Sequence, residues 1–471
     1  MGLFSKKEPI SLWTHNTYEH GFPSANNVTE KGKNYVSNMM NPNPMKNFMF
    51  DRYFGIDENS QSHKGLNVFV IGDEKRDIAD RIFRHQIEQL KSSFVVSTTS
   101  FTLLGLTRSL LAKHGYIIKV INYSDTLELS NLSNSVEQSM SFNFFDNVHT
   151  EERVTDLARS MVRLAPNYAK NNAYFNDCIM YLISASIMLL KINKRPTVKD
   201  LKTFVASANF KTEQEKLKGK NKFDSSFEEA MLFQNVGSEE NKYNAAHAYT
   251  MYKAFTRMSG KSRKHIVDGA IEVLNAYDQT PTAPRIKPYN FNEFANKKFA
   301  LFIIMDQKNK NYMSQGRLTT QEIVYQFDEL HKSNNPIRFM IEGIEAYNNI
   351  ADYTHITMNV GRHYFTTVLH EMNKDSELEK TQNEILASSA DVVIYTGTSM
   401  RDDPKRDYIM SMVEKIQSAN TEYKKITSKA KRGPNRECVV NKKESVEFKL
   451  AESDQLVIVQ GRGIFLTTTV Y

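Results

Sequence analysis

Cysteine is almost missing from this 471-residue sequence, which contains only Cys178 and Cys438. Two thiols are too few for a disulfide framework or for a metal site with four cysteine ligands. A chain without disulfides suits a reducing compartment, so we expect a cytoplasmic protein.

Long hydrophobic runs are missing as well. The longest, Cys178–Leu190, has about 13 residues, whereas a membrane-spanning helix needs about 20, so this run predicts a core helix. The N-terminal string MGLFSKK has no apolar core of a signal peptide, and its serine stands at position 5 instead of the position 6 that myristoylation requires. We therefore expect no segment that carries the chain through or onto a bilayer by itself.

The signatures of several enzyme classes are also absent. No G-x-S-x-G string occurs, so the nucleophile elbow of the α/β hydrolases has no support. His370-Glu371 begins like the H-E-x-x-H motif of metalloproteases, but the second histidine position is occupied by Lys374. The other histidines show no ligand spacing, and the sequence predicts no metal site.

Composition and charge are ordinary for a soluble globular protein. The chain is 40% hydrophobic and 24% charged, with a net charge of +7. Its length corresponds to about two or three domains. The modest positive charge permits contact with nucleic acid or a membrane surface and does not require it.

Strand and helix patterns divide the chain into α/β and all-helical parts. Strand patterns lie at 66–71, 93–97, 116–122, 299–305, 337–341, 366–369 and 391–396, and a hairpin-like pair closes the chain. Strands that alternate with helical stretches predict a parallel sheet with crossover helices. Residues 151–277 show helical periodicity instead, with Thr197 and Asp200 spaced as a capping box and a charged connector at 211–222. These patterns predict an α/β domain interrupted by an all-α insertion.

The first strand pattern ends in a glycine, as in nucleotide-binding motor domains. In a phosphate loop, G-x-x-x-x-G-K-[ST] supplies backbone N–H groups and a lysine to the phosphates. Here Gly72 is followed by the string DEKRDIA at 73–79, in which Lys75 is the only lysine. The strand, glycine and following helical stretch keep the spacing of a phosphate loop, but the second glycine, the lysine and the hydroxyl residue of the motif are absent from their positions.

A later strand pattern ends in an acidic residue. ATPases place an aspartate at the end of a buried strand to hold Mg²⁺, and often a glutamate beside it. The pattern at 337–341 ends in Glu342-Gly343, which has one carboxylate at most. A solvated carboxylate at a strand end is the favoured interpretation, and a metal-side acid is the alternative.

Two basic segments are candidate contacts for nucleic acid or a protein partner. Ser259-Gly260-Lys261-Ser262 contains the last letters of a phosphate loop, but Phe255 stands where the first glycine is required, and its context is helical. The second segment is the basic stretch within 419–449. The candidate contact residues are Lys261, Arg263, Lys264, Lys424, Lys425, Lys431 and Arg432. A solvated helix face and a solvated linker with almost no aromatic side chains are the alternative interpretations.

Taken in order, these pieces resemble the TraG/VirD-type coupling proteins of type IV secretion, which are hexameric conjugation ATPases. The version found in Gram-positive conjugative elements looks most similar, and the resemblance covers roughly residues 15–470. It is carried by the strand and loop at 70–94 and by G-Y-x-I-K-V-x-N at 115–122. The family's Y-x-x-F…G-K-T pattern matches 252–262, which ends in GKS here, and its V-R-F-I-L-D-E-F-A-N falls on 337–346, which reads IRFMIEGIEA.

The resemblance implies a RecA-like fold whose catalytic positions have been replaced. The family's phosphate-loop lysine and threonine fall on Ile78 and Ala79, its Asp-Glu pair on Glu342-Gly343, and its sensor segment on His370. The degenerate nucleotide-site positions are therefore Gly72, Lys75, Ile78, Ala79, Glu342, Gly343 and His370. Together they remove the groups that phosphoryl transfer uses.

The expected domains follow from the same resemblance. They are an extended N-terminal arm (1–64), the first part of a RecA-like domain (65–150), an all-α inserted domain (151–290), the second part of the RecA-like domain (291–418), a basic linker (419–449) and C-terminal strands that complete the RecA-like domain (450–471).

The resemblance also implies a catalytically inactive subunit with a structural or regulatory role in conjugative DNA transfer or type IV secretion. Its expected partners are an active coupling ATPase or other secretion components, with DNA and hetero- or homo-oligomers left open. Partners would hold it at the inner face of the membrane. No cofactor is expected. The alternatives are a divergent active DNA-translocating ATPase, which would use ATP and Mg²⁺, and a non-catalytic nucleic-acid-binding protein.

Overall fold

The structure is a computed structural model of the whole chain. It describes residues 12–13, 47–49, 55–57, 66–72, 78–125, 140–146, 148–166, 172–192, 196–210, 212–232, 238–259, 262–279, 287–294, 297–330, 337–344, 363–369, 386–387, 390–396, 409, 454–459 and 463–468. The chain divides into two compact units. The first comprises Met1–Ser92, Pro336–Glu345 and Ile350–Tyr471, and the second comprises Ser93–Asn335 and Ala346–Asn349.

The first unit contains a mixed sheet whose described strands are ordered β1-β14-β13-β12-β4-β11-β10. Their bounds are β1 Leu12–Trp13, β4 Asn67–Ile71, β10 Ile337–Glu342, β11 Tyr364–Leu369, β12 Val392–Tyr395, β13 Asp454–Val459 and β14 Gly463–Thr468. Strands β10, β11, β4 and β12 run parallel, whereas β12, β13 and β14 run antiparallel, and β1 joins β14 in parallel. The segment expected as an extended arm therefore contributes one strand to this sheet. It also holds a small antiparallel pair, β2 (Asn47–Met49) and β3 (Gly55–Asp57).

The centre of this sheet is apolar on both faces, as expected for parallel strands that are covered on both sides. In β4 the string NVFVI is buried from Val68 to Ile71. Helix α2 (Ile78–Glu88) follows, and Ile82, Phe83 and Ile87 are buried.

The second unit begins with three parallel strands ordered β5-β9-β6. They span Ser93–Thr98 (β5), Phe299–Met305 (β9) and Ile117–Tyr123 (β6), with α3 (Thr102–Lys113) after β5 and α12 (Lys310–Leu330) after β9. All seven residues of β9, FALFIIM, are buried. Its position between two neighbours explains why its sequence lacks the alternation of a half-exposed strand.

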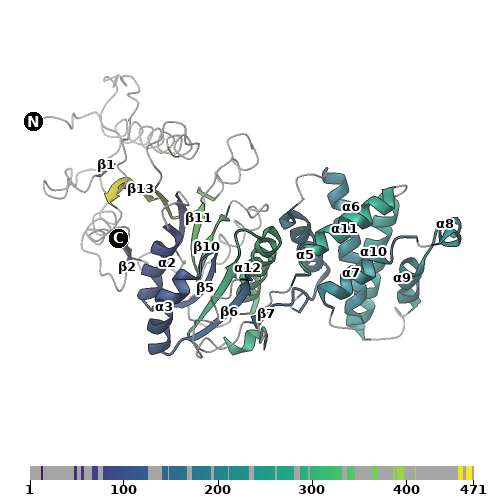
Figure 1. The fold of residues 1–471 in the computed structure, drawn as a ribbon, viewed down its shortest axis with the longest axis horizontal. Helices are drawn as coiled ribbons and strands as arrows, with labels where there is room; N and C mark the ends of the chain where they lie inside the picture. Colours follow the sequence, from purple (N-terminus) through teal and green to yellow (C-terminus); the bar gives the residue numbers. More distant parts are fainter. Residues whose placement is uncertain are drawn as a thin grey trace, which may run out of the picture. The chain divides into compact units, whose positions relative to one another are not determined.

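Between β7 (Met140–Ser141) and β8 (Lys287–Pro288), every regular element that the structure describes is helical (Figure 1). These helices are α5 (Glu151–Leu164), α6 (Ala173–Lys191), α7 (Val198–Ala206), α8 (Glu213–Lys218), α9 (Lys222–Leu232), α10 (Glu239–Ser259) and α11 (Arg263–Asn275). Strands β7 and β8 pair in parallel, so the chain enters and leaves this helical segment at one place. We call α5 to α11 the helical segment below.

Local sequence signals explain several helix boundaries. The predicted capping box is present: Thr197 accepts from the Asp200 N–H, and the Asp200 carboxylate accepts from the Thr197 N–H. Thr150 and Asn172 cap α5 and α6 in the same way with their side-chain oxygens. The stretch expected to be a charged connector at 211–222 instead contains the short helix α8 and the start of α9.

Helix α6 is the one described helix that is long and apolar enough to cross a membrane. Within the structure, 61% of its apolar window is buried, and Cys178, Ile179, Leu182, Ile183 and Ile187 belong to the hydrophobic core of the helical segment. Its apolarity is therefore accounted for by packing inside the protein.

Candidate functional site

Gly72 and Glu342-Gly343, three of the predicted nucleotide-site positions, lie at one edge of the first unit's sheet. Strand pairing places Glu342 beside Val368, and Val368 beside Val70. Gly72 follows directly, and its N–H donates to the Leu369 carbonyl over 3.0 Å. Neighbouring strands are about 4.8 Å apart, so Glu342 lies roughly 10 Å from the end of β4 across the sheet. The two positions are thus brought to the edge where parallel α/β sheets bind ligands.

The first two side chains of α2 are apolar. Ala79 is 2% exposed and has only a methyl group, and Ile78, the first residue of α2, is aliphatic. A phosphate loop needs an ammonium group and a hydroxyl at these two positions. Lys75 lies outside the described residues, so its relation to this edge stays a prediction.

The end of β10 has a backbone conformation that suits glycine. Gly343 has φ +70°, in the left-handed region where a side chain is strained. The end of β10 therefore carries the half-buried Glu342, followed by a position whose backbone disfavours any side chain. His370 follows the last residue of β11 and lies outside the described residues.

A buried polar network lies at the opposite end of these strands, near the starts of β10 and β11. The guanidinium of Arg338 is 1% exposed, donates to Gln86 Oε1 over 3.2 Å and lies 4.7 Å from the centre of the Tyr364 ring. The same Gln86 oxygen accepts from Thr366 Oγ1 over 3.0 Å. Gln86 therefore ties α2 to both β10 and β11. This network explains an arginine within a buried strand without a ligand.

One titratable group on α2 responds to its burial. Burial lowers the pKa of His85 below its usual 6.5, while Glu88 acts in the opposite direction and Lys91 adds to the lowering. Its Nε2 is buried without a hydrogen-bond partner. The folded protein therefore favours the neutral imidazole at this position.

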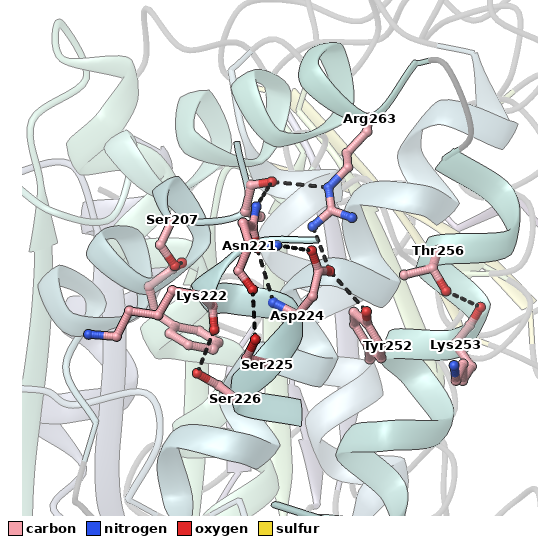
Figure 2. A network of polar contacts seen from close by, with 12 residues as sticks. Ser207, Asn221, Lys222, Asp224, Ser225, Ser226, Tyr252, Lys253, Thr256 and Arg263 are labelled. Atoms are coloured by element: carbon pink, nitrogen blue, oxygen red, sulfur yellow. Dashed lines mark hydrogen bonds and ion pairs between the residues drawn. The ribbon is translucent and has the colours of Figure 1, made fainter. Parts of the chain in front are cut away.

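The residues of the second predicted cluster, at the turn between α10 and α11, have different environments in the structure. Arg263 points inward: its guanidinium contacts Asp224 Oδ1 at 2.7 Å and donates to the Ala208 carbonyl over 3.0 Å (Figure 2). Lys264, the next residue, is exposed. Lys261, Lys424, Lys425, Lys431 and Arg432 lie outside the described residues. The predicted contacts of all these residues with nucleic acid or a partner stay predictions, and the charge of Arg263 is already paired within the chain.

Sequence reasoning missed the centre of this cluster, Asp224. Its carboxylate also accepts from the Tyr252 hydroxyl over 2.9 Å and from the Asn221 N–H over 3.1 Å (Figure 2). Asn221 in turn accepts from the Asp224 N–H, which makes a capping box at the start of α9. The signal is the N-x-x-D spacing at 221–224, which begins at the end of the predicted charged connector (211–222) and extends beyond it. We call Asn221, Asp224, Tyr252 and Arg263 the Asp224 network.

The Y-x-x-F…G-K-S pattern at 252–262 is explained by packing. The Tyr252 ring stacks on Phe227, with centroids 4.5 Å apart, and Phe255 is fully buried in the same core. The element before Ser259 is helix α10, with no strand, so the described residues give the Gly-Lys-Ser letters no phosphate-loop context.

Comparisons with known proteins identify the fold. No protein-family model matches the chain, and no curated protein matches it. Solved structures do. The unbound monoclinic form of the bacterial conjugative coupling protein TrwBdeltaN70 has a TM-score of 0.51 at 12% identity, covering 93% of this chain and 91% of that one. The plasmid coupling protein TrwB in complex with ADP and Mg²⁺ has a TM-score of 0.51 at 11% identity, covering 100% and 96%.

An identity this low relates folds and not activities. The chain shares the RecA-like fold of the TrwB structures along nearly its whole length. The α/β fold class predicted from the sequence, a RecA-like parallel sheet with flanking helices, is confirmed.

Proposed function

We propose that this protein is a coupling-ATPase-like subunit of a conjugative DNA-transfer or type IV secretion apparatus, with a structural or regulatory role and without ATP hydrolysis. The fold shared with TrwB supports the apparatus. The edge formed by β4, β11 and β10 supports the loss of catalysis. The single observation that carries it is the pair Ala79 and Gly343, where a buried methyl group and a left-handed glycine replace a Mg²⁺-binding hydroxyl and an acid.

The proposed partners are an active coupling ATPase or other secretion components, and contact with DNA belongs to the same proposal. Such partners would bring the chain to the inner face of the membrane from the cytoplasm. Phosphoryl transfer depends on positioned cations and donors around the phosphates, so a subunit that lacks them acts through its surfaces.

Isothermal calorimetry of the full chain with ATP and Mg²⁺, combined with a phosphate-release assay, tests the proposal. We expect no saturable binding below about 1 mM, which corresponds to less than about 4 kcal/mol of binding free energy. We also expect no turnover above a blank without protein.

Micromolar affinity for ATP would contradict the proposal, and so would turnover that Glu342→Ala abolishes. The matched control is Glu229→Ala, which removes an exposed carboxylate from α9. Turnover lost in both variants would point to general damage, whereas loss in Glu342→Ala alone would establish the divergent active motor. Steeply salt-dependent DNA binding that is lost on neutralising the basic residues of 424–443, without turnover and without binding to an active coupling ATPase, would instead support the non-catalytic nucleic-acid-binding alternative.

A further inference from the structure

Helix α12 is fastened by its side chains to the three strands of the second unit. The Tyr123 hydroxyl at the end of β6 lies 2.6 Å from Thr319 Oγ1, and Ser97 Oγ of β5 lies 2.9 Å from Thr320 Oγ1. Gly316 approaches β9 so closely that a Cβ there would lie 2.1 Å from Met305 Cγ. One face of α12 is therefore in contact with all three strands.

Other side chains of α12 are bonded to α5. The Arg153 guanidinium and the Glu322 carboxylate form an ion pair at 2.8 Å, with side chains 14% and 4% exposed. Gln321 Nε2 donates to Ser160 Oγ over 2.7 Å. Ser314 Oγ donates to the carbonyl of Leu164, the last residue of α5, over 2.6 Å.

The same helix is also bonded to the end of α11 and contributes to the helical core. Gln315 Nε2 donates to the carbonyls of Ala276 and Gln279, each over 3.0 Å. Leu318 is fully buried and belongs to the hydrophobic core of the helical segment. Apolar burial and side-chain hydrogen bonds thus act together at this junction.

The two segments that connect the strands to the helical segment, around β7 and β8, also contact each other. Besides the β7–β8 pairing, the Tyr289 N–H donates to the Ser141 carbonyl over 2.8 Å, and the Phe142 and Tyr289 rings lie 5.2 Å apart. Both connections are therefore held in place, in contrast to the exposed, sparsely bonded linkers that permit domain rotation.

We propose that α12 is a rigid coupling element that joins the helical segment to β5, β9 and β6, so that the segment moves with these strands as one body and does not hinge. A partner that binds and displaces α5 would then shift the strand ends that α12 contacts. The proposal concerns the second unit alone and does not depend on the proposed function.

Hydrogen exchange of the full chain, followed by mass spectrometry of peptides from α5, α12 and β9, tests this coupling. Residues that open together exchange through one cooperative event and share one protection factor. We expect the slowest amides of these three elements to have protection factors within about 3-fold of one another. Glu322→Gln leaves the Arg153 charge buried without its carboxylate, so it should accelerate all three by a common factor of about 100.

The matched control is Arg159→Gln, which removes an ion pair made entirely within α5, between Arg159 and Asp156. It should change exchange in β9 by less than about 2-fold, because that ion pair is half-exposed. If Glu322→Gln does not fold, Gln321→Ala removes one hydrogen bond and should accelerate the same three elements together by about 5-fold. Faster exchange of α5 with unchanged β9, in either variant, would overturn the proposal.

Discussion

Replacing Asp224 with asparagine would break the Asp224 network, which holds α9 against α10 and α11 (Figure 2). The substitution keeps the size and shape of the side chain and removes its charge. The Asp224 side chain is 3% exposed and that of Arg263 is 12% exposed, so neither charge can turn to water without local unfolding.

The expected loss follows from two contacts. Removing one member of a buried ion pair costs about 3–5 kcal/mol, and the low end applies here because Arg263 keeps the Ala208 carbonyl and the faces of three phenylalanine rings. An amide group facing the Asn221 N–H also weakens the cap of α9 by about 1 kcal/mol. Together the free energy of unfolding should fall by about 4 kcal/mol, a large share of the stability of an ordinary domain.

Urea unfolding monitored by circular dichroism at 222 nm measures this loss, and calorimetry should show the melting temperature lowered by roughly 10 °C. Tyr252→Phe removes one hydrogen bond to the same carboxylate and should cost about 1 kcal/mol. Asp268→Asn is the control: this exposed carboxylate of α11 accepts from the half-buried Asn209, and the change should stay within about 0.5 kcal/mol. An Asp224→Asn protein as stable as the Asp268→Asn control would refute the reasoning.

Two further predictions concern Gly343 and His85 of the first unit, with a comparison at Gly105 of the second unit. Gly343→Ala should lower the free energy of unfolding by about 1–2 kcal/mol, because φ +70° strains a Cβ. Gly105→Ala, in an exposed helical position of α3 with open space around it, should raise the free energy of unfolding by about 0.5–1 kcal/mol. Equal effects of the two changes on the urea midpoint would contradict the conformational argument. The second prediction concerns His85, because burial lowers its pKa in the folded state. The unfolded chain binds a proton at this residue near pH 6.5, and the folded chain does not. The contribution of His85 to stability is therefore complete above pH 6.5 and is lost as the pH falls below 6.5 toward the folded pKa. Replacing His85 with glutamine should flatten the urea midpoint between pH 7 and pH 5, and an unchanged slope would show that another group titrates there.

Much of the secondary structure could be predicted because it is encoded locally. The string FALFIIM predicts a buried strand, and the structure has β9 at the same bounds. Thr197 and Asp200 form the capping box that their spacing predicts. The prediction of a charged connector at 211–222 is wrong, because this stretch contains α8 and the start of α9. The start of α9 is stabilised by contacts of Asp224 with Tyr252 and Arg263, which are distant in sequence.

The residue identities of the candidate site could be predicted from the sequence, but their arrangement in space could not. The residue types at Ala79 and Glu342-Gly343 are visible in the sequence. The placement of Glu342 and Gly72 at one sheet edge depends on the register of β4, β11 and β10, in which β4 and β11 pair residues nearly 300 positions apart. The positive φ of Gly343 is likewise a property of the folded chain, since glycine alone permits either sign.

The sequence by itself determined the RecA-like class and the helical stretch within it, because periodicity and caps are local properties. Tertiary structure alone decided the pairing of Arg263 with Asp224, the attachment of the helical segment to the strands through α12, and the addition of β1 to β14. Each of these depends on contacts between residues far apart in the chain, and such contacts form only when the hydrophobic core brings their elements together.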